Sequence, residues 1–396
     1  ALPCRLAVQS GSWRELLHMI HDHESELQSH SEFSVEELAR KLSVTEQTFE
    51  TIFNTTGKTC PLDEFTSLSV NFSYDGDAPS IHMKYKAEVL DAQSAQRISG
   101  YHLKALALMV ADPDAEHTTQ SLLSDEERHF QIEGLAGPHR ELPDMRFHEL
   151  FEQRAAIQPE TIAGVCGDKQ WTYRELNERA NRLGRFLIAH GLDKEGVVAV
   201  VTERNLDWLA SVLAIFKAGG VYLPIEPHFP ADRIGRMLSR AECRLALSEN
   251  GSDTLLDQAL ETQPDTQKLL VVDAYTESHA KDNLGIEVAD DQAAYIYFTS
   301  GSTGEPKGAM CEHAGMINHI LAKIEDFGIE EGQVVAQIAP QCFDISLWQL
   351  VSALLVGGHT HILEQELVLD VQRFVETIVN GKVSVMQVVP SYLEVV

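Results

Sequence analysis

From residue 146 onward, short apolar strands alternate with amphipathic helices, and this alternation constrains the fold more than any other feature of the chain. Alternation of this kind is typical of helices layered on a largely parallel sheet. We therefore predict an α/β fold for this part. The expected strands are 197–201, 221–225, 244–248, 268–273, 293–298, 334–339, 359–365 and 383–389. The expected helices are one that starts in the Thr172/Glu175 capping box, 206–220, 230–242, 314–324, 345–358 and 371–379.

The first part of the chain has a different, mixed α and β pattern. The expected elements are a strand at 2–8, helices at 12–20 and after a Ser34/Glu37 capping box, a hairpin at 68–85 and a helix at 91–110. Residues 111–145 are polar, contain prolines and lack a sustained period, as an interdomain linker does. The sequence thus predicts three parts, 1–110, 111–145 and 146–396.

Composition excludes several classes of partner. The net charge of −29, from 60 acidic and 31 basic residues, argues against binding to nucleic acid or to an anionic membrane. No apolar run approaches the ~20 residues that a bilayer-spanning helix needs. Six cysteines without a CxxC pair favour reduced thiols and a cytoplasmic protein. A small or protein-bound substrate is expected instead.

The segment "YFTSGSTGEPKG", residues 297–308, combines bare backbone with hydroxyl groups and one lysine. Glycines let backbone N–H groups approach an anion closely, and the hydroxyls and the ammonium add further donors. The segment is not a Walker P-loop, because Pro306 and Gly308 stand where that motif requires glycine and a hydroxyl. The candidate phosphate-binding residues are Thr299, Ser300, Gly301, Ser302, Thr303, Gly304 and Lys307.

The same segment resembles the phosphate-binding signature of the adenylate-forming superfamily, in particular of nonribosomal peptide synthetase adenylation domains. "WTYRELNERANRLGRFL", "FKAGGVYLPIEP" and "FDISLW" resemble the first, second and fourth core motifs of that family, in the same order. The resemblance runs from about Met145 to Val396. Two positions depart from the usual pattern: Glu226 replaces an aspartate and Phe298 replaces a tyrosine.

The resemblance implies a two-substrate reaction. The carboxylate of an α-amino acid attacks the α-phosphate of ATP, pyrophosphate leaves, and the aminoacyl adenylate is passed to the phosphopantetheine thiol of a carrier domain in the same chain. The loop residues and Lys307 would hold the β- and γ-phosphates. Asp344 would pair with the substrate ammonium, although without the resemblance it would be a first-turn acid favoured by the helix dipole. The side-chain pocket would be lined by Ile345, Trp348 and Gln387.

The resemblance also implies an incomplete chain. The family's magnesium ligand, ribose-binding aspartate and catalytic lysine are expected beyond Val396, so we expect no complete catalytic set and no adenylation by residues 1–396 alone. The segments "LPCRL" and "FETIFNTTG" resemble the carboxy-terminal half of a condensation domain. The expected fold is a partial, mixed α+β condensation domain, then the layered, largely parallel large subdomain of an adenylation domain. Neighbouring synthetase domains are the expected partners.

Two other functions stay open at this point. One is a stand-alone acyl-CoA or aryl-acid ligase of the same superfamily, which Asp344 and the condensation-like leader disfavour. The other is a non-catalytic binding piece. We predict no metal site: His18, His21, His23 and His30 fit the polar face and end of a helix, and His359 and His361 lack a third ligand nearby. Cys342 has no base beside it in the sequence.

Overall fold

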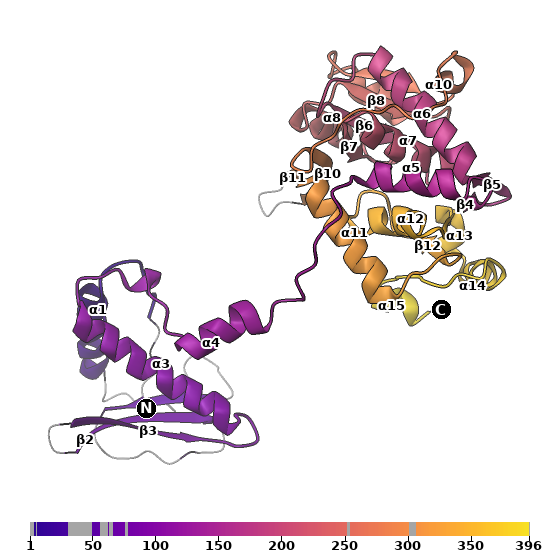
Figure 1. Ribbon diagram of the computed structural model, residues 1–396. Coiled ribbons are helices and arrows are strands. Elements are labelled where there is room, and N and C mark those ends of the chain that lie inside the picture. The colour runs from indigo at the N-terminus through magenta and orange to yellow at the C-terminus, as the bar shows by residue number, and fades with distance from the viewer. Residues whose placement is uncertain are drawn as a thin grey trace. The chain divides into compact units, whose positions relative to one another are not determined.

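A computed structural model describes residues 4, 6–30, 50–55, 62, 66–75, 78–251, 254–300 and 306–395. The chain separates into two compact units, Ala1–His139 and Arg140–Val396 (Figure 1). The division falls inside the stretch 111–145, which the sequence predicts as a linker. The condensation-domain identity of the first unit stays a prediction.

The described residues of the first unit include a small sheet and two long helices, α1 (Trp13–Ser29) and α3 (Ala92–Ala111). Strands β2 (Leu68–Asp75) and β3 (Ala78–Tyr85) pair antiparallel, which confirms the hairpin, and β1 (Thr51–Asn54) runs parallel to β2. The strand predicted at 2–8 is wrong for the described residues Cys4 and 6–8, which pair with no other strand. The Ser34/Glu37 capping box lies outside the described residues.

Part of the predicted linker packs on the first unit. It contains the short helices η1 (His117–Thr119), α4 (Asp125–His129) and η2 (Phe130–Gly134). Trp13 Nε1 donates a hydrogen bond of 2.7 Å to Gln120 Oε1, and Tyr101 donates one of 2.5 Å to Glu127. Residues as far as Glu127 therefore belong structurally with α1 and α3.

The second unit is built on two sheets, and both are largely parallel, as the alternating pattern predicts. The six-stranded sheet is parallel except for one edge strand, β11, which pairs antiparallel with its neighbour β10. Its order is β11 (Pro306–Glu312), β10 (Ala293–Ser300), β7 (Val221–Pro224), β6 (Val197–Val201), β8 (Leu245–Ser248) and β9 (Gln267–Leu270). Strand β11 is absent from the sequence prediction.

The four-stranded sheet has the order β12 (Val334–Gln337), β13 (His359–Ile362), β4 (Ile162–Cys166) and β5 (Lys169–Thr172). The strand predicted at 383–389 does not form. Its amides at Ser384 and Val385 both donate to the carbonyl of Val334, and a single bridge joins Val335 to Val385. The ladder therefore ends after one bridge.

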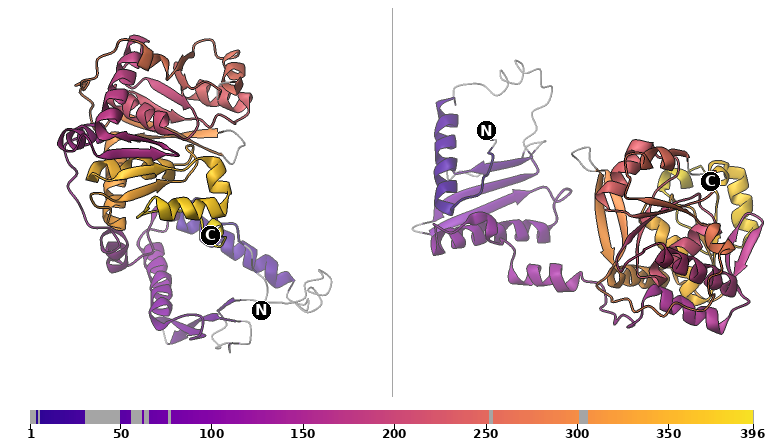
Figure 2. Two further views of the ribbon diagram at one scale, coloured as in Figure 1. Left: turned by 90° about the vertical axis from the view of Figure 1, so that its right-hand side faces the viewer. Right: turned by 90° about the horizontal axis from the view of Figure 1, so that it is seen from above.

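Helices fill the space between the two sheets and cover their outer faces (Figure 2). The inner helices are α5 (Phe147–Ile157), α6 (Tyr173–Ala189), α7 (Leu206–Lys217), α11 (His313–Phe327) and α12 (Ile345–Val356). The outer helices are α8 (Ala231–Arg240) and α9 (Thr254–Leu260) on the six-stranded sheet, and α14 (Val371–Asn380), after α13 (Gln365–Leu369), on the other. The short helices α10 (Asp273–Thr276) and α15 (Pro390–Leu393) complete the unit. In the part of the chain that is described, no helix has the length and apolarity to cross a membrane.

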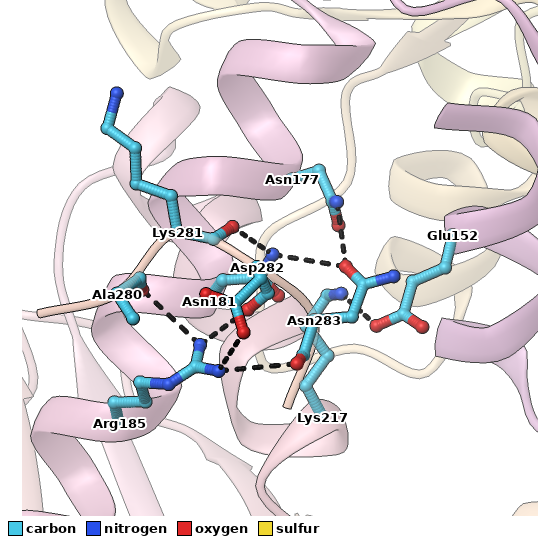
Figure 3. Close-up of polar contacts among 9 residues, drawn as sticks. All are labelled: Glu152, Asn177, Asn181, Arg185, Lys217, Ala280, Lys281, Asp282 and Asn283. Carbon is cyan, nitrogen blue, oxygen red and sulfur yellow. Dashed lines mark hydrogen bonds and ion pairs between the residues drawn. The ribbon is translucent and has the colours of Figure 1, made fainter. Parts of the chain in front are cut away.

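Helix α6 begins as the sequence predicts and then fixes the segment that leads into β10. The Glu175 amide donates to Thr172 Oγ1 at 3.2 Å, and the Thr172 amide donates to the Glu175 carboxylate at 2.9 Å, so the capping box is confirmed. Further along α6, Asn181 donates to the carbonyl of Lys281 at 2.7 Å, and Arg185 donates to that of Ala280 (Figure 3). These bonds hold residues 280–281 against α6, in a segment that pairs with no strand.

Candidate functional site

The two ends of the glycine-rich segment meet in the β10–β11 hairpin. Thr299 is paired with Lys307, and Thr299 Oγ1 donates to the Lys307 carbonyl at 3.5 Å. Both side chains are exposed. Ser300 ends β10, opposite Pro306, whereas Gly301, Ser302, Thr303 and Gly304 lie outside the described residues. The hairpin thus places Thr299 and Lys307 opposite each other at the carboxyl end of β10, the kind of sheet edge where α/β proteins bind ligands.

A loop before α12 crosses the same edge of the six-stranded sheet. Gln341 is fully buried, and its Nε2 donates to the Thr202 carbonyl at 2.9 Å and to the Ile225 carbonyl at 3.0 Å. These carbonyls lie just beyond the carboxyl ends of β6 and β7. The loop that carries Asp344 is therefore held directly above the parallel strands.

Glu226, one of the two departures from the family pattern, lies under this loop. Burial raises the pKa of its carboxyl group, while the positive charge of Arg204 and the backbone N–H groups of Cys342 and Gln341 lower it. Arg204 also donates to the carbonyl of Ile338 at the end of β12. Local sequence patterns do not indicate these contacts, because Glu226 and the loop, like Arg204 and Ile338, are more than a hundred residues apart in the chain.

Asp344 occupies the N-cap position of α12 and is exposed. Its Oδ1 accepts a hydrogen bond of 2.8 Å from the Ile345 amide, and Oδ2 has no hydrogen bond within the described residues. Burial is the main cause that raises the pKa values of Tyr295 and Tyr297, and the negative charge of Asp344 adds to both. The carboxylate is therefore within electrostatic reach of β10, the strand that leads into the glycine-rich segment.

The structure places the other three predicted pocket residues differently from one another. Trp348 is 2% exposed and stacks on Phe327 of α11, with ring centroids 5.3 Å apart. Ile345 packs against the same cluster and is half-buried. Gln387 is exposed, and its carbonyl accepts a hydrogen bond of 3.1 Å from Gln349 Nε2. Asp344, Ile345 and Trp348 thus share the start of α12, and Gln387 is joined to it through its backbone.

Within the described residues, the histidines and Cys342 lie in separate parts of the structure. His18, His21 and His23 lie on α1, and no group of three or more His, Cys, Asp or Glu residues able to hold a metal occurs among the residues described. Burial lowers the pKa values of His359 and His361. The Cys342 thiol donates to the Pro224 carbonyl at 3.4 Å, and burial raises its pKa to about 12. A thiolate nucleophile is therefore disfavoured at that position.

Comparison with known proteins agrees with this geometry. Residues 151–396 match the family model described as AMP-binding enzyme. The chain is 31% identical over 319 residues to gramicidin S synthase 2 of Brevibacillus brevis, an alignment that covers 80% of this chain and 7% of that protein. It is 33% identical over 316 residues to surfactin synthase subunit 2 of Bacillus subtilis (strain 168), covering 78% and 9%. The chain thus spans less than a tenth of the length of these relatives.

A solved structure is similar over almost the whole chain. It is the nonribosomal peptide synthetase FmoA3 in its alpha-methyl-L-serine-AMP bound form, with a TM-score of 0.76 at 21% identity. The alignment covers 96% of this chain and 44% of that one. At this identity the likeness concerns the fold, which includes the layered α/β arrangement of the second unit. The family match over residues 151–396 shows that this chain belongs to the AMP-binding enzyme family.

Proposed function

We propose that this chain is part of a nonribosomal peptide synthetase module that activates an α-amino acid with ATP. The observation that carries the proposal is the contact between the start of α12 and β10: the Tyr297 hydroxyl lies 3.2 Å from Ser346 Oγ, two residues after Asp344, and the carboxyl end of the same strand pairs Thr299 with Lys307. A carboxylate suited to an ammonium and a cation suited to phosphate thus occupy one edge of the sheet. The names of the relatives, which include gramicidin S synthase 2 and surfactin synthase subunit 2, support a synthetase.

The chemistry that we propose is mostly positioning and charge stabilisation. The substrate carboxylate and the triphosphate are both anions, so their approach requires donors placed in advance. The Lys307 ammonium and the Thr299 hydroxyl would contact the phosphates, and residues 300–304 would add backbone and hydroxyl donors. Asp344 would pair with the substrate ammonium and so orient the attacking carboxylate oxygen toward the α-phosphorus. A new O–P bond forms, and the bond to pyrophosphate breaks.

Two further groups belong to the proposal only through the family. Magnesium, when bound, neutralises phosphate charge, and the phosphopantetheine thiol of a carrier domain accepts the aminoacyl group. Neither has ligands that we can assign among the described residues, where no cluster of three metal-binding side chains occurs. The residues that we assign act by binding and orienting. The proposed partners are the amino acid, the carrier domain and the neighbouring synthetase domains.

The decisive experiment compares Asp344→Asn with the wild type in the full-length protein. We expect amino-acid-dependent ATP–pyrophosphate exchange in the wild type. In the variant we expect a much higher KM for the amino acid and a nearly unchanged KM for ATP, because the substrate ammonium would lose the carboxylate that pairs with it. Asp326→Asn, an exposed acid near the end of α11, is the matched control.

Other outcomes identify the alternatives. Equal losses for amino acid and ATP in Asp344→Asn mean that this residue only caps α12. Pyrophosphate exchange that depends on fatty or aryl acids instead of amino acids identifies a stand-alone acyl-CoA or aryl-acid ligase of the same superfamily. No exchange with any acid supports a non-catalytic binding role.

A further inference from the structure

Gln349 is a fully buried residue of α12 whose side chain bonds to two separate backbone segments. Its Oε1 accepts hydrogen bonds of 3.0 Å from the amides of both Ile338 and Ala339. Its Nε2 donates a hydrogen bond of 3.1 Å to the carbonyl of Gln387. One amide group therefore uses both its acceptor and its donor to connect segments that are about fifty residues apart.

The two segments lead to different residues of the proposed amino acid pocket. Residues 338–339 follow β12 and start the loop that ends at Asp344. Gln387 lies two residues beyond the single bridge between Val335 and Val385. In the described part of the chain, the bond from Gln349 is the one hydrogen bond that reaches residues 386–388. Among these hydrogen bonds, Gln387 is therefore positioned by Gln349 rather than by a strand ladder, while Val388 beside it packs against the cluster around Phe374.

The phosphate-binding hairpin has a separate attachment. Tyr297 of β10 lies 3.2 Å from Ser346 Oγ, and Ser346 Oγ donates to the Gln341 carbonyl at 3.0 Å. Among the described residues, Gln349 makes no hydrogen bond with β10 or β11. A change at Gln349 that removes only the bond to Gln387 should therefore affect the amino acid pocket and leave the ATP side of the site in place.

We propose that Gln349 is a positioning residue for the amino acid, because it sets the spacing between the Asp344 loop and Gln387. The inference rests on the proposed function and extends it to a residue outside the predicted pocket. If Gln349 had a purely structural role, replacing it would impair folding but would not change the KM for the amino acid while leaving the KM for ATP unchanged. The KM for the amino acid against the KM for ATP is thus the measurement that distinguishes positioning from packing.

The test uses two variants of the full-length protein. Gln349→Glu keeps the shape and the acceptor for both amides, and its ionised carboxylate has no donor for the Gln387 carbonyl, whereas Gln349→Met loses all three bonds. We expect Gln349→Glu to raise the amino acid KM about tenfold, as for a buried carbonyl left without its donor, with the ATP KM unchanged within about twofold. Gln349→Met should raise the amino acid KM further. Gln292→Met is the matched control, since Gln292 is a 4% exposed glutamine that bonds to the Ala289 amide instead.

Hydrogen exchange gives a second measurement that does not need activity. In Gln349→Glu, amides in residues 383–389 should exchange faster, while those of residues 338–339 stay protected. The inference is overturned if the two KM values in Gln349→Glu change together or not at all, or if that variant fails to fold. A wild-type protein without amino-acid-dependent exchange overturns the proposed function instead, so the two failures are distinguishable.

Discussion

The ammonium group of Lys217 lies against the carboxylate of Glu152, and the lysine side chain is fully buried. The pair joins α7 to α5 in the layer of helices between the two sheets (Figure 3). Burial lowers the pKa of Lys217 to about 8, and the charge and hydrogen bond of Glu152 oppose that shift. The cation is therefore tolerated in the core because of its partner.

Replacing Glu152 with alanine should destabilise the second unit by about 3–5 kcal/mol, because it leaves a buried cation without a counter-charge. We expect faster hydrogen exchange in α5 and α7 of the full-length protein. Glu178→Ala is the control, because Glu178 pairs with Lys281 at an exposed site and such pairs contribute at most about 1 kcal/mol. Equal effects of the two substitutions would contradict this interpretation of the buried pair.

Lys307→Ala should raise the KM for ATP by roughly 10- to 150-fold, because it removes a charge-assisted bond of about 1.5–3 kcal/mol. The fold should survive, since the Lys307 side chain is exposed. Pyrophosphate exchange at varied ATP concentration measures the change. Lys169→Ala on β5, an exposed lysine of the other sheet, serves as the control. An unchanged KM for ATP would remove Lys307 from the phosphate site.

Tyr297→Phe tests the attachment between β10 and α12. Ser346 Oγ gives its proton to the Gln341 carbonyl, so the Tyr297 hydroxyl must be the donor in the bond between them. Removing it leaves an acceptor that still makes one bond, and the cost should be about 1 kcal/mol. Because Tyr297 links the ATP side to the α12 side, we expect small rises in both KM values. A rise in only one of them would show that the two sides are held independently.

Two buried histidines should make the protein sensitive to acid. His148 of α5 and His313 of α11 are 4% and 1% exposed, with ring centroids 6.3 Å apart. Within the described residues, His148 Nδ1 and both ring nitrogens of His313 lack hydrogen-bond partners. Burial lowers the pKa of His148 to about 3, with Lys217, His313 and Arg146 adding to the shift. It lowers the pKa of His313 to about 4, where Arg146 adds and Glu195 opposes.

The sign of the effect follows from these values. As the pH falls below about 6.5, the unfolded chain binds a proton at each histidine while the folded chain does not. The free energy of unfolding should therefore fall by up to about 1.4 kcal/mol per pH unit for each histidine, until the pH reaches the folded pKa. Thermal unfolding of the full-length protein between about pH 7.5 and pH 5, which covers the upper part of this window, measures the slope. His313→Phe should give a shallower profile, and parallel profiles would contradict the assignment.

The sequence predicts the layered α/β fold because its strands are buried runs and its helices carry apolar stripes. The sequence-based prediction is wrong at two places where hydrogen bonding to a neighbouring strand determines whether a strand forms. Residues 383–389 alternate like a strand but have one bridge, whereas β11 carries Gly308 and no clear alternation yet pairs along the whole of β10. Thr299 and Lys307 could be proposed as phosphate-binding residues from their motif, a role that stays a prediction. Gln349 could not be proposed from the sequence, because its three bonds are tertiary contacts that no local pattern encodes.

The buried amides of Gln341 and Gln349 have a consequence for engineering. Suppose that only the side chains at 344, 345, 348 and 387 are exchanged for those of another pocket. If the new side chains shift the backbone, Gln341 and Gln349 would lose the backbone groups that they bond to. Gln341 fixes the loop to carbonyls of Thr202 and Ile225, far outside any such graft. A chimera with a productive pocket should therefore carry its own residues at 341 and 349 together with the carbonyl-bearing segments that they bind. The pocket residues should therefore be exchanged together with Gln341, Gln349 and the backbone segments to which these two side chains are hydrogen-bonded.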